Sequence, residues 1–328
     1  MNALVTGANG FLGSHLCREL VNENHNVTVL VRPSSDLSAL GNLPVNKKYG
    51  DITDASAVEA AVGGNDLVFH AAAHLSYWGN QKEIQNKINV EGTKNVVEAC
   101  LRRGVKKLVH VSSVAAVGIP PSSTEPAGED FRFNLENLPA LNYHLSKKRG
   151  EEIVLSAVEK GLNAVIVNPS AIWGRFGKTY RGAEIARKVR RSAVVPYFTG
   201  GICVVHVADV VDGIIAAWRH GKTGERYILG GENLTLQAIA RAAARAQNLR
   251  RRFVPVPNLL TGLSAVALES WGRITKTRPR ITFTTHYCAS RFHYYDSGKA
   301  EKELGYSPRS FQTILNECLS FIEPQNGN

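Results

Sequence analysis

A tyrosine and a lysine stand four residues apart in the segment Tyr143-His144-Leu145-Ser146-Lys147. If this segment is helical, both side chains lie on one face and reach the same small region of space. A free tyrosine titrates near pKa ~10, and a nearby ammonium group stabilises its phenolate form. The spacing therefore predicts that Lys147 lowers the pKa of Tyr143, so that the phenol can donate and accept a proton near neutral pH.

Two serines provide a second polar feature, because Ser112 and Ser113 follow the apolar run 108–111. If that run is a strand, both hydroxyls lie near the carboxyl edge of a sheet, where open α/β sheets bind their ligands. A serine hydroxyl at this edge could hold a carbonyl oxygen. Since adjacent strand residues point to opposite faces, only one of the two is expected to face the site, and the alternation does not decide which.

The first apolar run leads into a glycine-rich turn, Thr6-Gly7-Ala8-Asn9-Gly10-Phe11-Leu12-Gly13. Glycines at Gly7, Gly10 and Gly13, between an expected strand and an expected helix, let backbone N–H groups approach a pyrophosphate at the positive end of that helix. The turn therefore predicts a dinucleotide-binding site. We expect Asn9, Phe11 and Leu12 to contact the same ligand.

The residue after the second expected strand bears on which dinucleotide is bound. An NAD site commonly carries Asp or Glu at this place, where the carboxylate binds the adenosine 2'-hydroxyl. This chain has Arg32, followed closely by Ser34 and Ser35, and a cation with two hydroxyls suits a 2'-phosphate. The sequence therefore favours NADP(H), with NAD(H) as the alternative if Arg32 is an ordinary surface residue.

These groups must be positioned by alternating strands and helices, because short β-branched runs alternate with helical patterns in the first half of the chain. The expected strands are Ala3–Thr6, Val27–Val31, Leu67–His70, Leu108–Ser112 and Ala164–Asn168. Helices are expected at Asn89–Arg103 and Tyr143–Lys160, ending at Gly104 and Gly161 in left-handed caps. The fold class is α/β, a Rossmann-type doubly wound parallel sheet with a smaller C-terminal α/β substrate domain.

The length of 328 residues exceeds one average domain. We expect a dinucleotide-binding domain at 1–170, rejoined by 203–230, in which residues 203–220 form a strand–helix pair that returns to the sheet. Segments 171–202 and 231–328 would form the smaller, substrate-binding domain, with a helix at Leu236–Gln247.

Composition narrows the function classes. No run of about 18 apolar residues predicts a membrane-spanning helix, and no basic segment precedes the apolar run at 3–5 to suggest export. The five cysteines are scattered without a CxxC pair, which indicates reduced thiols in a cytoplasmic protein. The histidines have no metal-ligand spacing, so no metal is predicted; they include His70, His74, His110, His144 and His206.

A net charge of +11 would suit nucleic acid, an anionic membrane surface or a phosphorylated ligand. Only Arg250–Arg252 forms a compact basic run, and no nucleic-acid reading motif is present, so no nucleic-acid partner is expected. The most lipid-like stretch is Leu259–Leu268. Our first interpretation is a helix that covers the substrate pocket, and the second is weak contact with a membrane surface.

Several motifs together carry a family resemblance over nearly the whole chain. They are residues 6–13, Gly50-Asp51-Ile52, His70-Ala71-Ala72-Ala73, Asn89-Val90-Glu91-Gly92-Thr93, Ser112-Ser113, the Tyr143–Lys147 segment, His206-Val207-Ala208-Asp209-Val210 and Leu304-Gly305-Tyr306-Ser307-Pro308. With these motifs the chain resembles the extended short-chain dehydrogenase/reductases, also called the NAD-dependent epimerase/dehydratase family.

The resemblance implies a role for individual residues. It implies Ser113 as the catalytic serine, Tyr143 as the acid–base residue and Lys147 as a ligand of the nicotinamide ribose. The further residues it implies are Asn89, which supports the active site; Asp51 and Ile52, near the adenine; and Ala71, Ala72, Ala73, Ser112, Pro169 and Ser170, which contact the cofactor. It also implies a homodimer formed through the helices at 89–103 and 143–160.

Positions at which this sequence differs from particular subfamilies indicate which of the family's reactions it catalyses. Sugar-nucleotide dehydratases place an Asp-Glu pair where this chain has Val114 and Ala115, neither of which can move a proton. Nucleotide-sugar epimerases typically carry an asparagine where this chain has Ala171, although the cations Arg175, Lys178, Arg181 and Arg291 could compensate.

The overall likeness is to the branch with dihydroflavonol 4-reductases, 3-beta-hydroxysteroid dehydrogenases and hopanoid-associated sugar epimerases. We therefore rank first an NADP(H)-dependent oxidoreductase that reduces a carbonyl, or oxidises the alcohol, of a sizeable and partly apolar small molecule. Tyr77, Trp78, Trp173 and the segment 259–271 are the candidates for an apolar pocket. The alternatives are a sugar or nucleotide-sugar epimerase with a tightly bound dinucleotide, and a non-catalytic NADP(H)-binding sensor.

Overall fold

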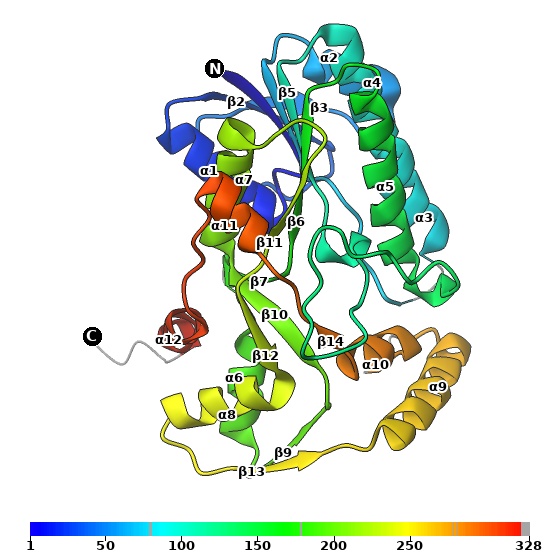
Figure 1. Cartoon of the computed structure of the whole chain (residues 1–328), viewed down its shortest axis with the longest axis vertical. Coiled ribbons are helices and arrows are strands. Elements are labelled where there is room, and N and C mark those ends of the chain that lie inside the picture. The colour runs from blue at the N-terminus through cyan, green and yellow to red at the C-terminus, as the bar shows by residue number, and fades with distance from the viewer. Residues whose placement is uncertain (79–80, 178, 278, 280, 323–328) are drawn as a thin grey trace.

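The computed structural model describes residues 1–328 except 79–80, 178, 278, 280 and 323–328 (Figure 1). Its main element is a parallel sheet in the order β11-β6-β5-β4-β1-β2-β3. The seven strands are β1 (Asn2–Thr6), β2 (Asn26–Val31), β3 (Asn46–Tyr49), β4 (Leu67–His70), β5 (Lys107–Val111), β6 (Ala164–Pro169) and β11 (Arg226–Leu229).

Helices cover both faces of this sheet (Figure 1). One face carries α1 (Phe11–Asn22), α7 (Val207–His220) and α11 (Gly298–Leu304), and the other carries α2 (Ala55–Val62), α4 (Gly92–Arg103) and α5 (Asn142–Val158). Because the central strands are buried on both faces, they are continuous apolar runs rather than alternating ones. In β4, for example, all four residues are buried.

The strand order places a crevice between β1 and β4. From β1 the chain proceeds outward through β2 and β3, then crosses back to β4 on the opposite side of β1 and continues to β5 and β6. At such a reversal the connections leave the sheet in opposite directions, and ligands of open α/β sheets bind in the gap at the carboxyl ends. The β1–α1 turn and residues 71–73 after β4 both lie at this point.

Close packing at the β1–α1 turn explains two of its glycines. Gly7 has a left-handed φ of +71°, and a Cβ there would lie 2.7 Å from the backbone of Ala71 and Ala72. A Cβ on Gly13 would lie 2.2 Å from the carbonyl oxygen of Gly7. The turn can therefore fold back on itself, and pack against the end of β4, only without these side chains.

A second, smaller sheet contains β12 (Glu232–Thr235), β10 (Gly201–His206), β7 (Ala171–Phe176) and β8 (Thr179–Arg181), with β14 (Phe292–His293) paired to β10. Helices α6 (Ala183–Arg191), α8 (Leu236–Ala246) and α12 (Phe311–Ile322) share an apolar core with it. Strands β9 (Val194–Tyr197) and β13 (Arg252–Pro255) pair separately, and α9 (Asn258–Thr275) packs on α10 (Phe283–Ala289).

The five expected strands of the large sheet are present, with ends that differ by at most one residue, and the predicted fold class is confirmed. Strand β3 was missed because its sequence, Asn-Lys-Lys-Tyr, is fully exposed at the sheet edge and has no apolar periodicity. The expected helix at 89–103 begins with a π-helical turn at Lys87–Glu91. Gly104 and Gly161 have φ values of +62° and +95°, as the expected left-handed caps require.

The prediction that residues 203–220 rejoin the large sheet is half correct. Helix α7 packs on that sheet, but β10 pairs with β7, β12 and β14 of the smaller sheet. The strand that rejoins the large sheet is β11, beside β6. Apolar pattern alone could not separate these strands, because β10 and β11 are both short buried runs. The division of the chain into two domains remains a prediction.

No helix within the described ranges is long and apolar enough to cross a membrane.

Replacement of Gly13 by alanine should lower the free energy of unfolding by about 1–3 kcal/mol, because the added methyl group overlaps the Gly7 carbonyl. Urea denaturation measures the change. Gly128→Ala is the matched control, since a Cβ there meets nothing within 4 Å, and it should stay within about 0.5 kcal/mol of wild type. Equal stability of the two variants would contradict the packing described for this turn.

Candidate active site

A cavity of about 590 Å³ lies at the carboxyl ends of β5 and β6. It is lined by ten of the predicted site residues, six of which are Ser112, Ser113, Tyr143, Lys147, Pro169 and Ser170. These residues come from three separate stretches of chain, which the parallel sheet and α5 bring to one edge. Their chemical roles stay predictions, but their proximity is a property of the fold.

Tyr143 lies in the first turn of α5, one turn before Lys147. Burial raises the pKa of the Tyr143 phenol above its ordinary value, and the nearby Ser113 side chain partly opposes this shift. The sequence led us to expect a lowered pKa. The direction differs because the cavity walls shield the phenol from solvent, which disfavours the charged phenolate form.

Lys147 is only 3% exposed, and its Nζ donates a hydrogen bond to the carbonyl oxygen of Val111 at 2.9 Å. Burial lowers the pKa of Lys147 to about 8, while the negative charge of Glu151 acts in the opposite direction. The ammonium group therefore joins α5 to the end of β5, and it can change its protonation state just above neutral pH.

The two serines do not divide between opposite faces as strand alternation predicted, since both line the cavity. Strand β5 ends at Val111, so the alternation no longer applies at 112 and 113. The Ser113 Oγ accepts a hydrogen bond from the N–H of Ala115 at the start of a short 3₁₀ turn, Val114–Ala116. The Oγ atoms of Ser112 and Ser170 are buried and have no hydrogen-bond partner among the described residues, so both can bond a ligand in the cavity.

A buried network behind the cavity was not predicted. The Nδ2 of Asn168 donates to the carbonyl oxygen of Ser113 at 2.9 Å and to Oε1 of Glu151 at 2.6 Å. Glu151 is fully buried and pairs with Arg226 of β11 at 3.2 Å. A carboxylate four residues after Lys147, on the same helix face, was the available sequence signal. The network fixes the backbone at Ser113 and places a negative charge near Lys147.

Asn89, which the family resemblance implied, lies in the π-helical turn and does not line the cavity. Its side chain accepts from the N–H of His74 at 2.7 Å, and donates to the His74 carbonyl at 3.1 Å and to Oγ of Ser146 at 2.9 Å. It thus ties the segment after β4 to α5. A π-helical turn often marks a functional position.

The features around the glycine-rich turn fit a dinucleotide phosphate. Gly10 is the N-cap of α1 and provides no side-chain acceptor for the first N–H groups of the helix. A Cβ on Gly10 would meet only the Gly7 carbonyl, at 3.1 Å. Free N–H donors beside open space at a helix start are suited to a phosphate. Phe11, Leu12, Ala71 and Ala73 continue the cavity lining toward this turn.

The remaining predicted cofactor residues lie outside the cavity lining. Arg32 is exposed and forms no ion pair within the described residues. Partial burial would raise the pKa of Asp51, but hydrogen bonds from Thr53 and the charge of Arg32 together lower it. Ile52 is buried beneath Gly92. The side-chain amide of Asn9 donates a long hydrogen bond to the Asp36 carbonyl, at 3.4 Å. The N–H of Ala72 donates to the hydroxyl of Thr6.

The other half of the cavity is mostly apolar and includes Leu75, Tyr77, Ile202 and Leu236. Of its two imidazoles, His144 is buried and His293 is half-buried. Burial lowers the pKa of His144 to about 3 and that of His293 to about 4, so both are neutral at pH 7. Arg181 also lines it and stacks on Phe11 at 5.0 Å.

Three predicted pocket features are wrong. Trp78 does not line the cavity and lies beside Gly272 of α9 instead. Trp173 packs in the core of the smaller sheet against Phe311, and α9, which contains residues 259–271, contributes no residue to the lining. Instead α10 closes this side, through Thr285, Cys288 and Ala289. Threonine and cysteine in a short helix gave no pattern that sequence reasoning could use. Lys178 lies outside the described residues.

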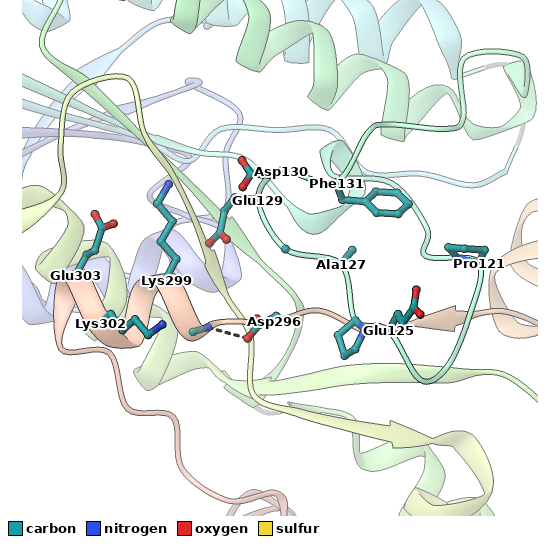
Figure 2. Close-up of a pocket in the computed structure, with 13 residues that line it drawn as sticks. Pro121, Glu125, Ala127, Glu129, Asp130, Phe131, Asp296, Lys299, Lys302 and Glu303 are labelled. Carbon is teal, nitrogen blue, oxygen red and sulfur yellow. Dashed lines mark hydrogen bonds between the residues drawn. The ribbon is translucent and has the colours of Figure 1, made fainter.

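A second cavity, of about 600 Å³, lies between the loop at 121–131 and α11 (Figure 2). Its side chains carry both charges, including Glu129, Asp296 and Lys299. Glu129 accepts from the N–H of Ile228, and Asp296 accepts from Gly298. None of the described buried polar atoms that lack a partner lines it, so it offers no group for chemistry comparable to the first cavity.

A doubly wound parallel sheet, a glycine-rich β1–α1 turn and an adjoining cavity define the class of Rossmann-fold proteins. The chain belongs to the NAD dependent epimerase/dehydratase family, whose model matches residues 3–230. The predicted family is therefore confirmed. Its members are oxidoreductases and epimerases that bind NAD(P).

Relatives support the extended short-chain dehydrogenase/reductase branch. A putative dihydroflavonol 4-reductase of Synechocystis sp. is 33% identical, over 97% of this chain and 94% of its own. Sterol demethylase protein B of Methylococcus capsulatus is 30% identical, over 98% of both chains. The crystal structure of gox2253 aligns with a TM-score of 0.81 and 35% identity, over 97% of each chain.

The pKa of Lys147 can be measured directly, by NMR titration of protein carrying ¹³Cε-labelled lysine, with Lys147→Arg to assign the signal. We expect a midpoint near 8, the ammonium form being lost as the pH rises through this value. In Glu151→Gln the midpoint should lie lower, because a nearby negative charge that favours the ammonium form is removed. A wild-type midpoint near the ordinary lysine value of ~10.4 would contradict the burial described here.

Proposed function

We propose that the protein is an NADP(H)-dependent reductase of a carbonyl group on a sizeable, partly apolar small molecule, or catalyses the reverse oxidation. The observation that carries the proposal is the shared cavity. Ser113, Tyr143 and Lys147 line one end of a largely apolar space, and Phe11 and Leu12 of the glycine-rich turn line it as well. A dinucleotide extended from that turn would bring its nicotinamide to the three side chains.

The chain's own residues would handle the proton and the carbonyl oxygen. Tyr143 donates a proton to the oxygen, and the Ser113 hydroxyl, held by Ala115 and by the Asn168 contact to its backbone, orients that oxygen. When bound, NADPH supplies the hydride that adds to the carbonyl carbon. Lys147 favours the phenolate left on Tyr143 and binds the nicotinamide ribose, while Ser112 and Ser170 provide hydroxyls for the nicotinamide.

The apolar half of the cavity supports the substrate class. Leu75, Tyr77, Ile202 and the two neutral imidazoles offer little to a charged molecule. The names of two relatives denote a dihydroflavonol and a sterol, both ring compounds with extensive apolar surface. We infer that this chain takes a substrate of comparable size.

One observation favours the alternative, an epimerase of a sugar or nucleotide sugar. Arg181 lines the cavity, and a guanidinium group there could bind a diphosphate. Against this, Arg181 stacks on Phe11, and Ala171, at the position where an amide anchor was expected, offers no polar group. We therefore keep the reductase first.

The same proposal includes a homodimer in the cytoplasm. Helices α4 and α5 form a shallow surface groove with partly buried apolar residues, among them Leu101 and Ile153. This is the helix pair that the family resemblance implied for dimer formation.

The test is to give the purified protein NADPH deuterated at the nicotinamide C4, with a pool of apolar ketones, and to analyse the products by mass spectrometry. Deuterium in a released alcohol, with matching oxidation of NADPH, is the expected result. Tight NADPH binding with no net transfer to any ketone would support an epimerase or a sensor instead.

Tyr143→Phe should lower turnover by about 10²–10⁴-fold, because the proton donor is removed, while NADPH binding stays nearly unchanged. Tyr77→Phe is the matched control. Its ring lies 6.1 Å from that of Tyr143 and lines the same cavity, but the proposed mechanism gives its hydroxyl no role. Similar losses in both variants would mean that the cavity, and not the Tyr143 hydroxyl, limits the reaction.

Arg32→Ala should weaken NADPH binding by about 10–100-fold, the usual effect of losing a charge-assisted hydrogen bond to phosphate, and should leave NADH binding unchanged. Isothermal titration with both dinucleotides measures the change, and Arg250→Ala controls for the loss of one exposed positive charge. Wild-type protein that binds NADH more tightly than NADPH would overturn the cofactor preference.

A further inference from the structure

Helix α9 exposes its large apolar residues to solvent, whereas an ordinary surface helix buries them. Its buried positions are small residues, Thr261, Ala265 and Gly272. Its solvent-exposed positions include a set of large apolar residues, which we call the outer face of α9: Leu259, Leu260, Leu263, Val266, Trp271 and Ile274.

The buried face of α9 carries small residues because neighbouring segments of the chain lie close to it. A Cβ on Gly272 would lie 3.0 Å from the ring of Trp78, and a Cβ on Gly262 would lie 3.2 Å from His286 of α10. The hydroxyl of Thr261 contacts the His286 ring at 3.0 Å. These contacts fix which side of α9 faces the protein, so the outer face cannot be buried by rotation of the helix.

The outer face is large and continuous along the helix. Leu259, Leu263, Trp271 and Ile274 are each more than 60% exposed. Single exposed apolar residues are ordinary, but a contiguous row of them marks an interaction surface. The residues recur at spacings of three, four and eight, so they share one side of a helix over about four turns.

The charged residues in and after α9 indicate what kind of partner covers its outer face. The segment 258–282 contains one acidic residue, Glu269, and that residue pairs with Arg273. The same segment contains four basic residues, Arg273, Lys276, Arg278 and Arg280, of which the last two lie outside the described residues. The whole chain carries a net charge of +11. An apolar helix face followed by basic residues is complementary to a bilayer with anionic headgroups.

We propose that the outer face of α9 docks the protein on the surface of an anionic lipid bilayer. The helix lies in the plane of the interface with Leu263, Trp271 and Ile274 among the acyl chains, and Arg273 and Lys276 at its C-terminal end contact the headgroups. The expected dimer helices, α4 and α5, lie on another part of the molecule, so docking and dimer formation do not compete (Figure 1).

Docking would also bring the cavity close to the lipid. Helix α10 packs on α9 and contributes Thr285, Cys288 and Ala289 to the cavity lining. An apolar substrate dissolved in the bilayer would then have a short path to Tyr143. This last step rests on the proposed function, whereas the docking itself does not.

Sedimentation of the full-length protein with vesicles tests the proposal without any enzyme assay. Wild-type protein should sediment with vesicles of phosphatidylcholine mixed with phosphatidylglycerol, much less with phosphatidylcholine alone, and less in high salt. Leu263→Ser combined with Ile274→Ser should lower the bound fraction at least about tenfold. Tyr49→Ser is the matched control, because Tyr49 is a 60% exposed aromatic residue outside α9, and it should bind like wild type.

Tryptophan fluorescence supplies a second readout. Trp271 is 64% exposed, while Trp78, Trp173 and Trp218 are buried or half-buried. Docking should therefore shift the tryptophan emission to the blue. The Trp271→Phe variant should lose this shift but still sediment with the vesicles. Wild-type protein that stays in solution with the anionic vesicles overturns the proposal. A dimer that becomes a monomer in the double variant also overturns it, and would assign the outer face of α9 to a second copy of the chain.

Discussion

The arrangement of the site depends on the burial of one ammonium group. Lys147 is almost fully enclosed, and a buried charge must be hydrogen-bonded if the folded state is to tolerate it. Its bond to the Val111 carbonyl satisfies that need and fixes α5 against the end of β5. Tyr143, one turn earlier on the same helix, is thereby placed over the residues that follow β5, where Ser113 lies. One contact thus positions the three side chains relative to one another.

The surrounding polar groups support this contact from both sides. Asn168, at the end of β6, joins the Ser113 backbone to Glu151, and Glu151 lies one turn after Lys147 on α5. Asn89 joins the segment after β4 to Ser146, the residue before Lys147. Three strand ends are therefore connected to one helix by side-chain amides. Such groups hold their partners in one geometry, because a buried donor or acceptor left without a partner is costly.

Local sequence was informative wherever a short stretch has one structural solution. The turn at 6–13 needs glycine because Gly7 and Gly13 pack against backbone, and the strands of the large sheet are apolar because both faces are covered. The spacing of Tyr143 and Lys147 depends only on helix geometry. Sequence reasoning failed where tertiary packing decides: β3 is a polar edge strand, β10 joins a different sheet, and Trp173 is core. The direction of the Tyr143 pKa shift was wrong for the same reason, since burial cannot be read from spacing.

The most direct test of this account is a crystal structure of the protein with NADP⁺. We predict the pyrophosphate at the start of α1 beside Gly10, the 2'-phosphate against Arg32, and the nicotinamide in the cavity between Ser170 and Tyr143, with its ribose within hydrogen-bond distance of Lys147. A dinucleotide bound with its nicotinamide outside this cavity, or with Lys147 still bonded only to Val111, would contradict the roles proposed for these residues.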